Sequence, residues 1–327
     1  GGVEDSMTKR LRQHTHAWQH MPHESSEQIA RGVLRANIDI AIELAGLTDT
    51  LGVCTLAHQP APVAVTAIGY PNTCGTARIH ARVVDSATDP GDADCDAMES
   101  LFCLDPCFLC YSPPIEASAV PTRDSSRPIT FGSFNAAHKL NREIVQVWAG
   151  VLEAVPTSTL LLKASGLQES NALEDASRRL AAWGLPMHRV RVVPATRSRA
   201  EHLAMYGHVD IALDTFPYHG TTTTCEALYM GTPVITLAGD RHVSRVGVSL
   251  LRAVGLTEFI ATSPQDYVRI AADLAAERPR VATLHASLRD RLLASALCDE
   301  RAYGERFAAM LRSLWLRQCE KSATSAG

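Results

Sequence analysis

The stretch Asp214–Glu226 (DTFPYHGTTTTCE) shows how this chain of 327 residues is built. It follows a short, mainly apolar run, Asp210–Asp214, and leads into the segment Thr222–Met230, which stops at Gly231. A short apolar run bounded by polar residues is typical of a buried strand, and a glycine just past an apolar segment marks a helix end. The stretch therefore predicts a junction between a strand and a helix.

The same alternation extends over the second half of the chain. The predicted strands are Ile129–Phe134, Thr159–Lys163, Val190–Val193, Asp210–Asp214, Pro233–Leu237 and Phe259–Ala261. The predicted helices are Arg142–Ala154 with Asn141 as N-cap, Gln168–Trp183, Arg199–Tyr206, Thr222–Met230, Arg241–Val254 before Gly255, Pro264–Glu277, Arg280–Leu297 and Glu300–Arg317. Apolar strands that alternate with helices predict an α/β fold with a parallel sheet covered on both faces. Such sheets bind ligands beyond the carboxyl ends of their strands.

The first part of the chain reads as a partial α/β unit. Three runs, Ile38–Ala45, Ala61–Ile68 and Leu101–Tyr111, are strand candidates. The segment Pro113–Pro128 is rich in Pro, Ser and Ala and is typical of a linker. The chain length also suits two domains, and we predict one over residues 1–115 and a second over residues 116–327.

The composition excludes several classes of protein. Hydrophobic residues make up 46%, charged residues 20%, and the net charge is −4, which gives no reason to expect nucleic acid or an anionic membrane as partner. No apolar run reaches the roughly 20 residues of a membrane-spanning helix. The polar segment Gly1–Gln13 has no signal-peptide core. We therefore expect a cytoplasmic protein.

The nine cysteines are spread along the chain, which favours reduced thiols over a disulfide framework. Cys103, Cys107 and Cys110 lie close together in an apolar stretch, and we interpret them as buried free thiols; the alternative is a zinc site, which lacks a clear fourth ligand. The pair His16 and His20 also lacks further ligands. We predict no metal site.

The threonine run is the strongest candidate for a binding site. Four threonines, Thr221–Thr224, are poor helix-interior residues, but at a helix start their hydroxyl and N–H groups form a cradle for anions. Gly220 would let a ligand approach the backbone closely. Glu226 lies one turn after Thr222, on the same face, where a carboxylate is able to bind a ribose diol. The alternative is a helix capped by hydroxyls with no ligand.

Two further loops follow strands and carry cations. Lys139 lies in Phe134–Asn141 (FNAAHKLN), where it is able to reach a phosphate, or it is a surface lysine near a helix start. Arg199 and His202 lie in the basic run Arg189–His202, which either meets a base edge or phosphate or forms a solvated basic face. No Gly-rich dinucleotide fingerprint or P-loop is present in the sequence.

Several of these blocks resemble a known family. ITFGSFNAAHKLN, RAEHLAMYGHVDIALDTFPYHGTTTTCEALYMGTPVITLAGDRHVSRVGVSLL and, upstream, HQPAPVAVTAIGYPNTCG are similar to the catalytic region of O-GlcNAc transferase and SPINDLY-like enzymes, glycosyltransferase family 41, in its bacterial form. The resemblance runs from about Arg31 to Arg317. It implies a GT-B fold with two Rossmann-like lobes, the N-terminal one incomplete because the family's first strand and histidine-bearing loop have no match. The tetratricopeptide repeats that usually precede the region have no match either.

The resemblance also implies an activity. Such enzymes transfer GlcNAc from UDP-GlcNAc to Ser or Thr hydroxyls of acceptor proteins, with inversion and without a metal or other cofactor. A transferase that uses another donor, such as GDP-fucose in the SPINDLY branch, and a non-catalytic nucleotide-sugar-binding fragment are the alternatives.

The resemblance assigns roles to individual residues. Lys139, Thr222 and Thr223 would contact the diphosphate, and Lys139 is the residue expected to act in catalysis. His202 and Arg199 would lie at the nucleobase. Glu226 would hold the ribose, where animal enzymes have aspartate. Thr221 stands where animal enzymes carry histidine.

Overall fold

The structure is a computed structural model that describes residues 4–91, 97–114, 119, 120, 123, 126–163 and 170–325. The chain divides into two compact units, each described here by itself. The N-terminal unit comprises residues 1–83, 94–102 and 309–327, and the C-terminal unit comprises residues 84–93 and 103–308.

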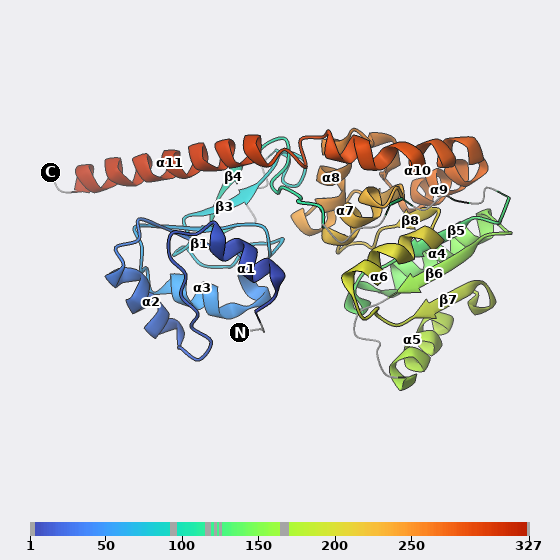
Figure 1. Cartoon of the computed structure of the whole chain (residues 1–327), viewed down its shortest axis with the longest axis horizontal. Helices are drawn as coiled ribbons and strands as arrows, with labels where there is room; N and C mark the ends of the chain where they lie inside the picture. Colours follow the sequence, from blue (N-terminus) through green and yellow to red (C-terminus); the bar gives the residue numbers. More distant parts are fainter. Residues whose placement is uncertain are drawn as a thin grey trace. The chain divides into compact units, whose positions relative to one another are not determined.

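The C-terminal unit is built on a parallel sheet of six strands in the order β10-β9-β8-β5-β6-β7 (Figure 1). The strands are β5 Thr130–Ser133, β6 Thr159–Lys163, β7 Val190–Val193, β8 Ile211–Leu213, β9 Val234–Leu237 and β10 Ile260–Ala261. The chain order reverses beside β5, since β6 lies on one side of it and β8 on the other. Crevices for ligands form at such a reversal, beyond the carboxyl ends of the strands.

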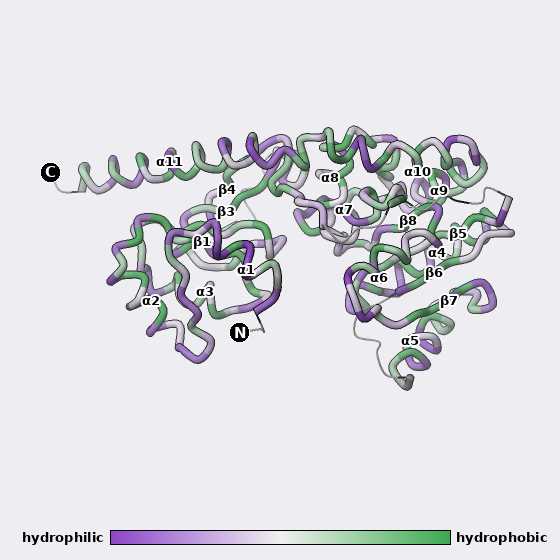
Figure 2. Tube along the Cα trace, viewed as in Figure 1, coloured by the Kyte–Doolittle hydropathy of each residue, from purple (hydrophilic) through white to green (hydrophobic). Residues whose placement is uncertain are grey.

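Helices cover this sheet because their apolar faces repeat with helical spacing. The helices are α4 Arg142–Ala154, α5 Ser170–Ala182, α6 Arg199–Ala204, α7 Thr222–Tyr229, α8 Val246–Val254, α9 Pro264–Ala276 and α10 Arg278–Leu293. The last helix, α11 Glu300–Ser325, has residues in both units. In α4 the side chain of Asn141 caps the start by accepting from the N–H of Ile144, and Trp148 is fully buried. Hydrophilic and hydrophobic residues alternate along α11 (Figure 2).

The α/β fold and all six strands predicted for the second half are confirmed, with ends that differ by at most one residue. The predicted helix Arg241–Val254 is instead a short 3-10 helix, His242–Ser244, followed by α8. Arg245 separates them because its backbone leaves the helical region. Gly255 ends α8 in the left-handed conformation, as expected for a C-terminal glycine. The predicted helix start at Gln168 lies outside the described residues.

The N-terminal unit contains a four-stranded sheet in the order β1-β2-β3-β4. Its strands are β1 Ile40–Glu43, β2 Val63–Thr66, β3 Ala81–Val84 and β4 Ser100–Cys103, and its helices are α1 Ser6–Gln13, α2 Ser26–Arg35 and α3 Thr50–Ala57. A small core of Val53, Leu56, Ala64, Cys74 and Ile79 lies between α3 and the sheet. Strand β3 and the three helices were not predicted from the sequence.

The predicted strand Leu101–Tyr111 is wrong beyond its first residues, because only Ser100–Cys103 pairs in the sheet. The rest is an irregular, mostly buried segment held by Asp85, whose carboxylate accepts from the N–H of Phe108 at 2.8 Å. The N–H of Tyr111 donates to the carbonyl of Leu297 at 2.8 Å. Residues 103–114 therefore belong to the C-terminal unit.

The compact units consequently differ from the predicted boundary between residues 115 and 116, which itself lies outside the described residues. The far end of α11 also returns to the N-terminal unit from residue 309 onward. A helix rises about 1.5 Å per residue, so the 26 residues of α11 are long enough to take part in both units.

The described cysteines are free thiols. Cys107 is buried and burial raises its pKa to about 11, whereas Cys110 is half-buried. Cys103 is exposed, which corrects the expectation of three buried thiols. Among the described residues, no three His, Cys, Asp or Glu side chains gather as a metal site would require. Nor does any described helix have the length and apolarity needed to cross a bilayer.

Gly132 in β5 provides a test of the packing beneath the site. An alanine Cβ there would lie 2.4 Å from Cγ2 of Val209, so we expect Gly132→Ala to destabilise the C-terminal unit by about 1–3 kcal/mol. Gly150→Ala in α4 is the control, since its Cβ would meet only Val268 at 3.4 Å and alanine favours a helix by up to about 1 kcal/mol. Urea unfolding followed by tryptophan fluorescence measures both. Equal midpoints for the two variants would contradict the packing described here.

Candidate functional site

A buried carboxylate organises the loop that joins β8 to α7. Asp214 directly follows β8 and is 2% exposed. Its Oδ1 accepts from the N–H of Thr215 at 2.9 Å and of Gly220 at 2.8 Å, and its Oδ2 accepts from the hydroxyl of Thr236 at 2.9 Å. These bonds close the loop on itself, so the start of α7 is fixed relative to the sheet.

His219 completes the loop as a neutral, fully buried side chain. Its Nε2 donates to the carbonyl of Leu237 at 2.9 Å, and its Nδ1 accepts from the N–H of Gly247 at 3.0 Å. Burial lowers the pKa of His219, which agrees with the neutral ring that these two bonds require. The backbone carbonyl of His219 is thereby held in a fixed direction.

Lys139 comes to this carbonyl from the loop after β5. It ends a 3-10 turn, Ala137–Lys139, and its Nζ donates to the carbonyl of His219 at 2.6 Å. The ammonium also lies 4.0 Å from the ring centre of Tyr218. Burial lowers the pKa of Lys139 while the charge of Asp214 acts in the opposite direction. Lys139 thus meets the loop that leads into the threonine run, at a residue 80 positions further along the chain.

The first turn of α7 presents backbone N–H groups. Thr221 is the N-cap residue but its side chain makes no capping bond. The hydroxyl of Thr223 donates to Oδ1 of Asn135 at 3.0 Å, and the hydroxyl of Thr224 donates to the carbonyl of Gly220 at 3.2 Å. Two of the hydroxyls predicted to face a ligand are therefore used within the protein. The N–H groups of a helix's first turn lack helical partners and carry its positive dipole end.

The structure explains the glycine at position 220 differently from the sequence, which suggested close approach of a ligand. A Cβ at this position would lie 2.4 Å from the hydroxyl of Thr223 and 2.9 Å from Oδ1 of Asn135. The glycine is required by the close packing of the loop on its own side chains, and close approach of a ligand is not needed to explain it.

The opposite end of the site is a connected group of charged and polar side chains. Glu226 on α7 is 5% exposed, and its Oε2 lies 2.9 Å from Nε2 of His202 on α6. Its Oε1 lies 3.7 Å from Nη2 of Arg199 at the start of α6. Nδ1 of His202 is hydrogen-bonded to Nζ of Lys163, the last residue of β6. The structure therefore brings Arg199, His202 and Glu226 together, whereas their predicted contacts with a nucleobase and a ribose remain predictions.

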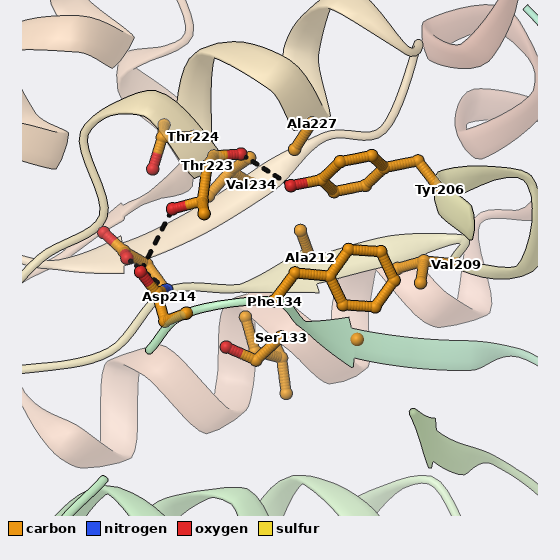
Figure 3. A pocket seen from close by; sticks show the side chains of 13 residues that line it. Ser133, Phe134, Tyr206, Val209, Ala212, Asp214, Thr223, Thr224, Ala227 and Val234 are labelled. Atoms are coloured by element: carbon orange, nitrogen blue, oxygen red, sulfur yellow. Dashed lines mark hydrogen bonds between the residues drawn. The ribbon is translucent and has the colours of Figure 1, made fainter. Parts of the chain in front are cut away.

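A small cavity of about 20 Å³ lies beneath α7, between that helix and strands β5 and β8 (Figure 3). Tyr206 closes one end by donating its hydroxyl to the carbonyl of Thr223 at 3.0 Å. Such a volume suits a single water molecule. A nucleotide is far too large for this cavity.

Sequence reasoning missed four residues of this site, Asn135, Lys163, Asp214 and His219, as participants with roles of their own. All four lie at or after the carboxyl ends of strands, which is the signal that could have identified them. Their roles depend on partners that are distant in the sequence.

The fold places the protein among glycosyltransferases with the GT-B fold. A sucrose-phosphate synthase from Thermosynechococcus elongatus aligns over 91% of this chain and 81% of its own, with a TM-score of 0.58 and 15% identity, which shows the fold alone. The O-GlcNAc transferase of Thermobaculum terrenum, solved as its K341M mutant, aligns over 98% of this chain and 61% of its own, with a TM-score of 0.92 and 31% identity.

The sequence narrows this class to one family. The model of glycosyl transferase family 41 matches residues 121–307. Probable UDP-N-acetylglucosamine–peptide N-acetylglucosaminyltransferases named SPINDLY are 40% identical in Arabidopsis thaliana and 42% identical in Oryza sativa, each over 91% of this chain. The chain belongs to glycosyl transferase family 41. It spans about a third of the length of these curated relatives, 33% and 32% respectively.

The loop around Asp214 gives a second prediction. Asp214→Ala leaves the N–H groups of Thr215 and Gly220 without their acceptor, so we expect the C-terminal unit to lose about 2–4 kcal/mol of stability. Hydrogen exchange measured by mass spectrometry should be faster across the 215–220 loop. Asp290→Ala, at an exposed position of α10, is the control and should change neither quantity. Unchanged exchange in the Asp214 variant would show that the carboxylate does not hold the loop.

Proposed function

We propose that this chain holds the donor-binding and catalytic region of a protein O-GlcNAc transferase. It would move GlcNAc from UDP-GlcNAc to Ser or Thr hydroxyls of acceptor proteins, with inversion, without a metal, and in the cytoplasm. The names of its SPINDLY relatives, probable UDP-N-acetylglucosamine–peptide N-acetylglucosaminyltransferases, support this proposal. The observation that carries it is the contact of Lys139 with the loop that opens α7.

The leaving group explains why that contact matters. When the bond between the sugar and the diphosphate breaks, negative charge builds up on the phosphate oxygens. The Lys139 ammonium and the first-turn N–H groups of α7 supply positive charge at this point, and they are already fixed before the reaction. Preorganised groups of this kind stabilise a transition state more than the ground state, which raises the rate.

Glu226 supports binding at the nucleoside end. A carboxylate accepts up to about four hydrogen bonds, and Glu226 receives one from His202 and a distant approach from Arg199. Acceptor capacity is left for the two hydroxyls of a ribose. Arg199 is exposed enough to reach the base edge, and His202 lies behind it against Glu226.

Inversion requires a single displacement. The acceptor oxygen forms its bond to the anomeric carbon from the face opposite the diphosphate, while the bond to the β-phosphate oxygen breaks. The acceptor proton passes to an oxygen of the departing diphosphate or to solvent water. Cations and N–H dipoles on the diphosphate side make the step feasible without a metal, because they stabilise the departing charge directly.

Binding experiments test the donor site. We expect Lys139→Ala to weaken the affinity for UDP by about 10- to 100-fold, since a charge-assisted contact worth about 1.5–3 kcal/mol is lost. Titration calorimetry measures this loss, with Lys9→Ala on the exposed face of α1 as the matched control. Equal affinity in the Lys139 and Lys9 variants would remove Lys139 from the site.

The same titration separates the donors. Tight binding of UDP with weak binding of GDP supports UDP-GlcNAc, and the reverse supports GDP-fucose. Transfer is then measured as the mass gained by Ser/Thr peptides, with and without EDTA. Nucleotide binding with no transfer by the longest natural form of the protein would favour a nucleotide-sugar binder without catalytic activity.

A further inference from the structure

Lys163 is a buried cation that the proposed reaction does not use directly. It ends β6, is 6% exposed, and therefore lies at the carboxyl edge of the sheet. Its Nζ is hydrogen-bonded to Nδ1 of His202 and lies 5.2 Å from the ring centre of Phe134. In the described part of the chain, no carboxylate forms an ion pair with it. The ammonium thus rests on a neutral ring nitrogen and an aromatic face.

This arrangement is costly for the fold. Burial lowers the pKa of Lys163 to about 8, although the charge of Glu226 acts in the opposite direction. A methionine would fill a similar volume without desolvating a charge, and apolar replacements of buried ions are often neutral or stabilising. Packing therefore does not account for a lysine at this position.

The hydrogen bond favours one tautomer of the His202 ring. An ammonium group donates only, so Nδ1 of His202 has to accept. In the neutral ring the proton then lies on Nε2, which donates to Oε2 of Glu226 at 2.9 Å. The other tautomer would direct a lone pair at the carboxylate. Phe134 and Tyr206, with ring centres 6.0 and 5.6 Å from that of His202, limit its reorientation.

The tautomer of His202 affects how the two carboxylate oxygens of Glu226 are used. His202 holds Oε2, while Oε1 has only Arg199 at 3.7 Å. We propose that Lys163 is a positioning residue: by fixing the tautomer of His202, it aims the Glu226 carboxylate at the sugar hydroxyls of a bound nucleoside diphosphate. This inference rests on the proposed nucleotide site, and it adds a requirement for Lys163 that the known contacts of the site do not contain.

The variants Lys163→Met and Lys163→Arg test the role. We expect Lys163→Met to bind UDP about 10-fold more weakly, with a melting temperature equal to or above that of the wild type. Lys163→Arg keeps a donor and should recover part of the affinity. Lys9→Met is the matched control and should leave affinity and melting temperature unchanged. A structural lysine would instead lower the melting temperature in step with affinity.

A ligand without sugar hydroxyls isolates the path through Glu226. We expect 2′,3′-dideoxy-UDP to bind the wild type and Lys163→Met with equal affinity, because the hydroxyls that Glu226 would hold are missing. An undiminished loss with this ligand would show that Lys163 acts on the phosphates or the base, and the inference would be wrong.

The tautomer is readable in the protein without nucleotide. Long-range ¹H–¹⁵N NMR spectra should show the His202 proton on Nε2 in the wild type and a mixed or reversed tautomer in Lys163→Met. An unchanged His202 spectrum in that variant overturns the inference even if UDP binds. Failure of the wild type to bind either UDP or GDP overturns the proposed function, whereas the NMR result still decides what Lys163 does to His202.

Discussion

The candidate site depends on the carboxylate of Asp214. This carboxylate accepts hydrogen bonds from loop N–H groups that have no backbone acceptor. A loop between a strand and a helix cannot satisfy its N–H groups by regular pairing, and a buried unpaired N–H is costly. Asp214 accepts from both ends of the turn, at Thr215 and Gly220, and is tied to β9 through Thr236. The position of the first turn of α7 follows from these bonds. The His219 carbonyl, and with it Lys139, is placed by the same loop.

Two of the hydroxyls in the threonine run bond to groups of the protein itself. The hydroxyls of Thr223 and Thr224 bond to Asn135 and Gly220, so they stiffen the helix start. In the proposed donor site, the groups that would meet a ligand are the first-turn N–H groups of α7 together with Lys139 and Glu226. Rigid backbone dipoles suit a diphosphate, since they need no reorganisation when its charge increases.

The sequence predicted most of the C-terminal unit because its signals are local. Apolar runs located the six strands, Asn141 the start of α4, and Gly255 the end of α8. The sequence did not predict features that depend on distant partners. Leu104–Tyr111 has the apolar pattern of a strand but is held as a loop by Asp85. The role proposed for Lys163 depends on its hydrogen bond to His202, 39 residues away. The sequence assigned Gly220 to the site because it would let a ligand approach the backbone. The structure shows that close packing against neighbouring side chains already requires a glycine there.

The two lysines of the site share a physical property that links stability to binding. Burial lowers the pKa of both Lys139 and Lys163 below the ordinary value of 10.5. The unfolded chain therefore holds these protons more tightly than the folded one. For Lys163, the resulting loss of stability is fully present below pH 8 and is relieved as pH rises from about 8 toward 10.5. A bound diphosphate would raise the pKa of Lys139 again, because an opposite charge favours the protonated form. At the proposed site, a bound diphosphate would therefore relieve the cost of the buried charge of Lys139, which the exposed cations of the chain do not carry.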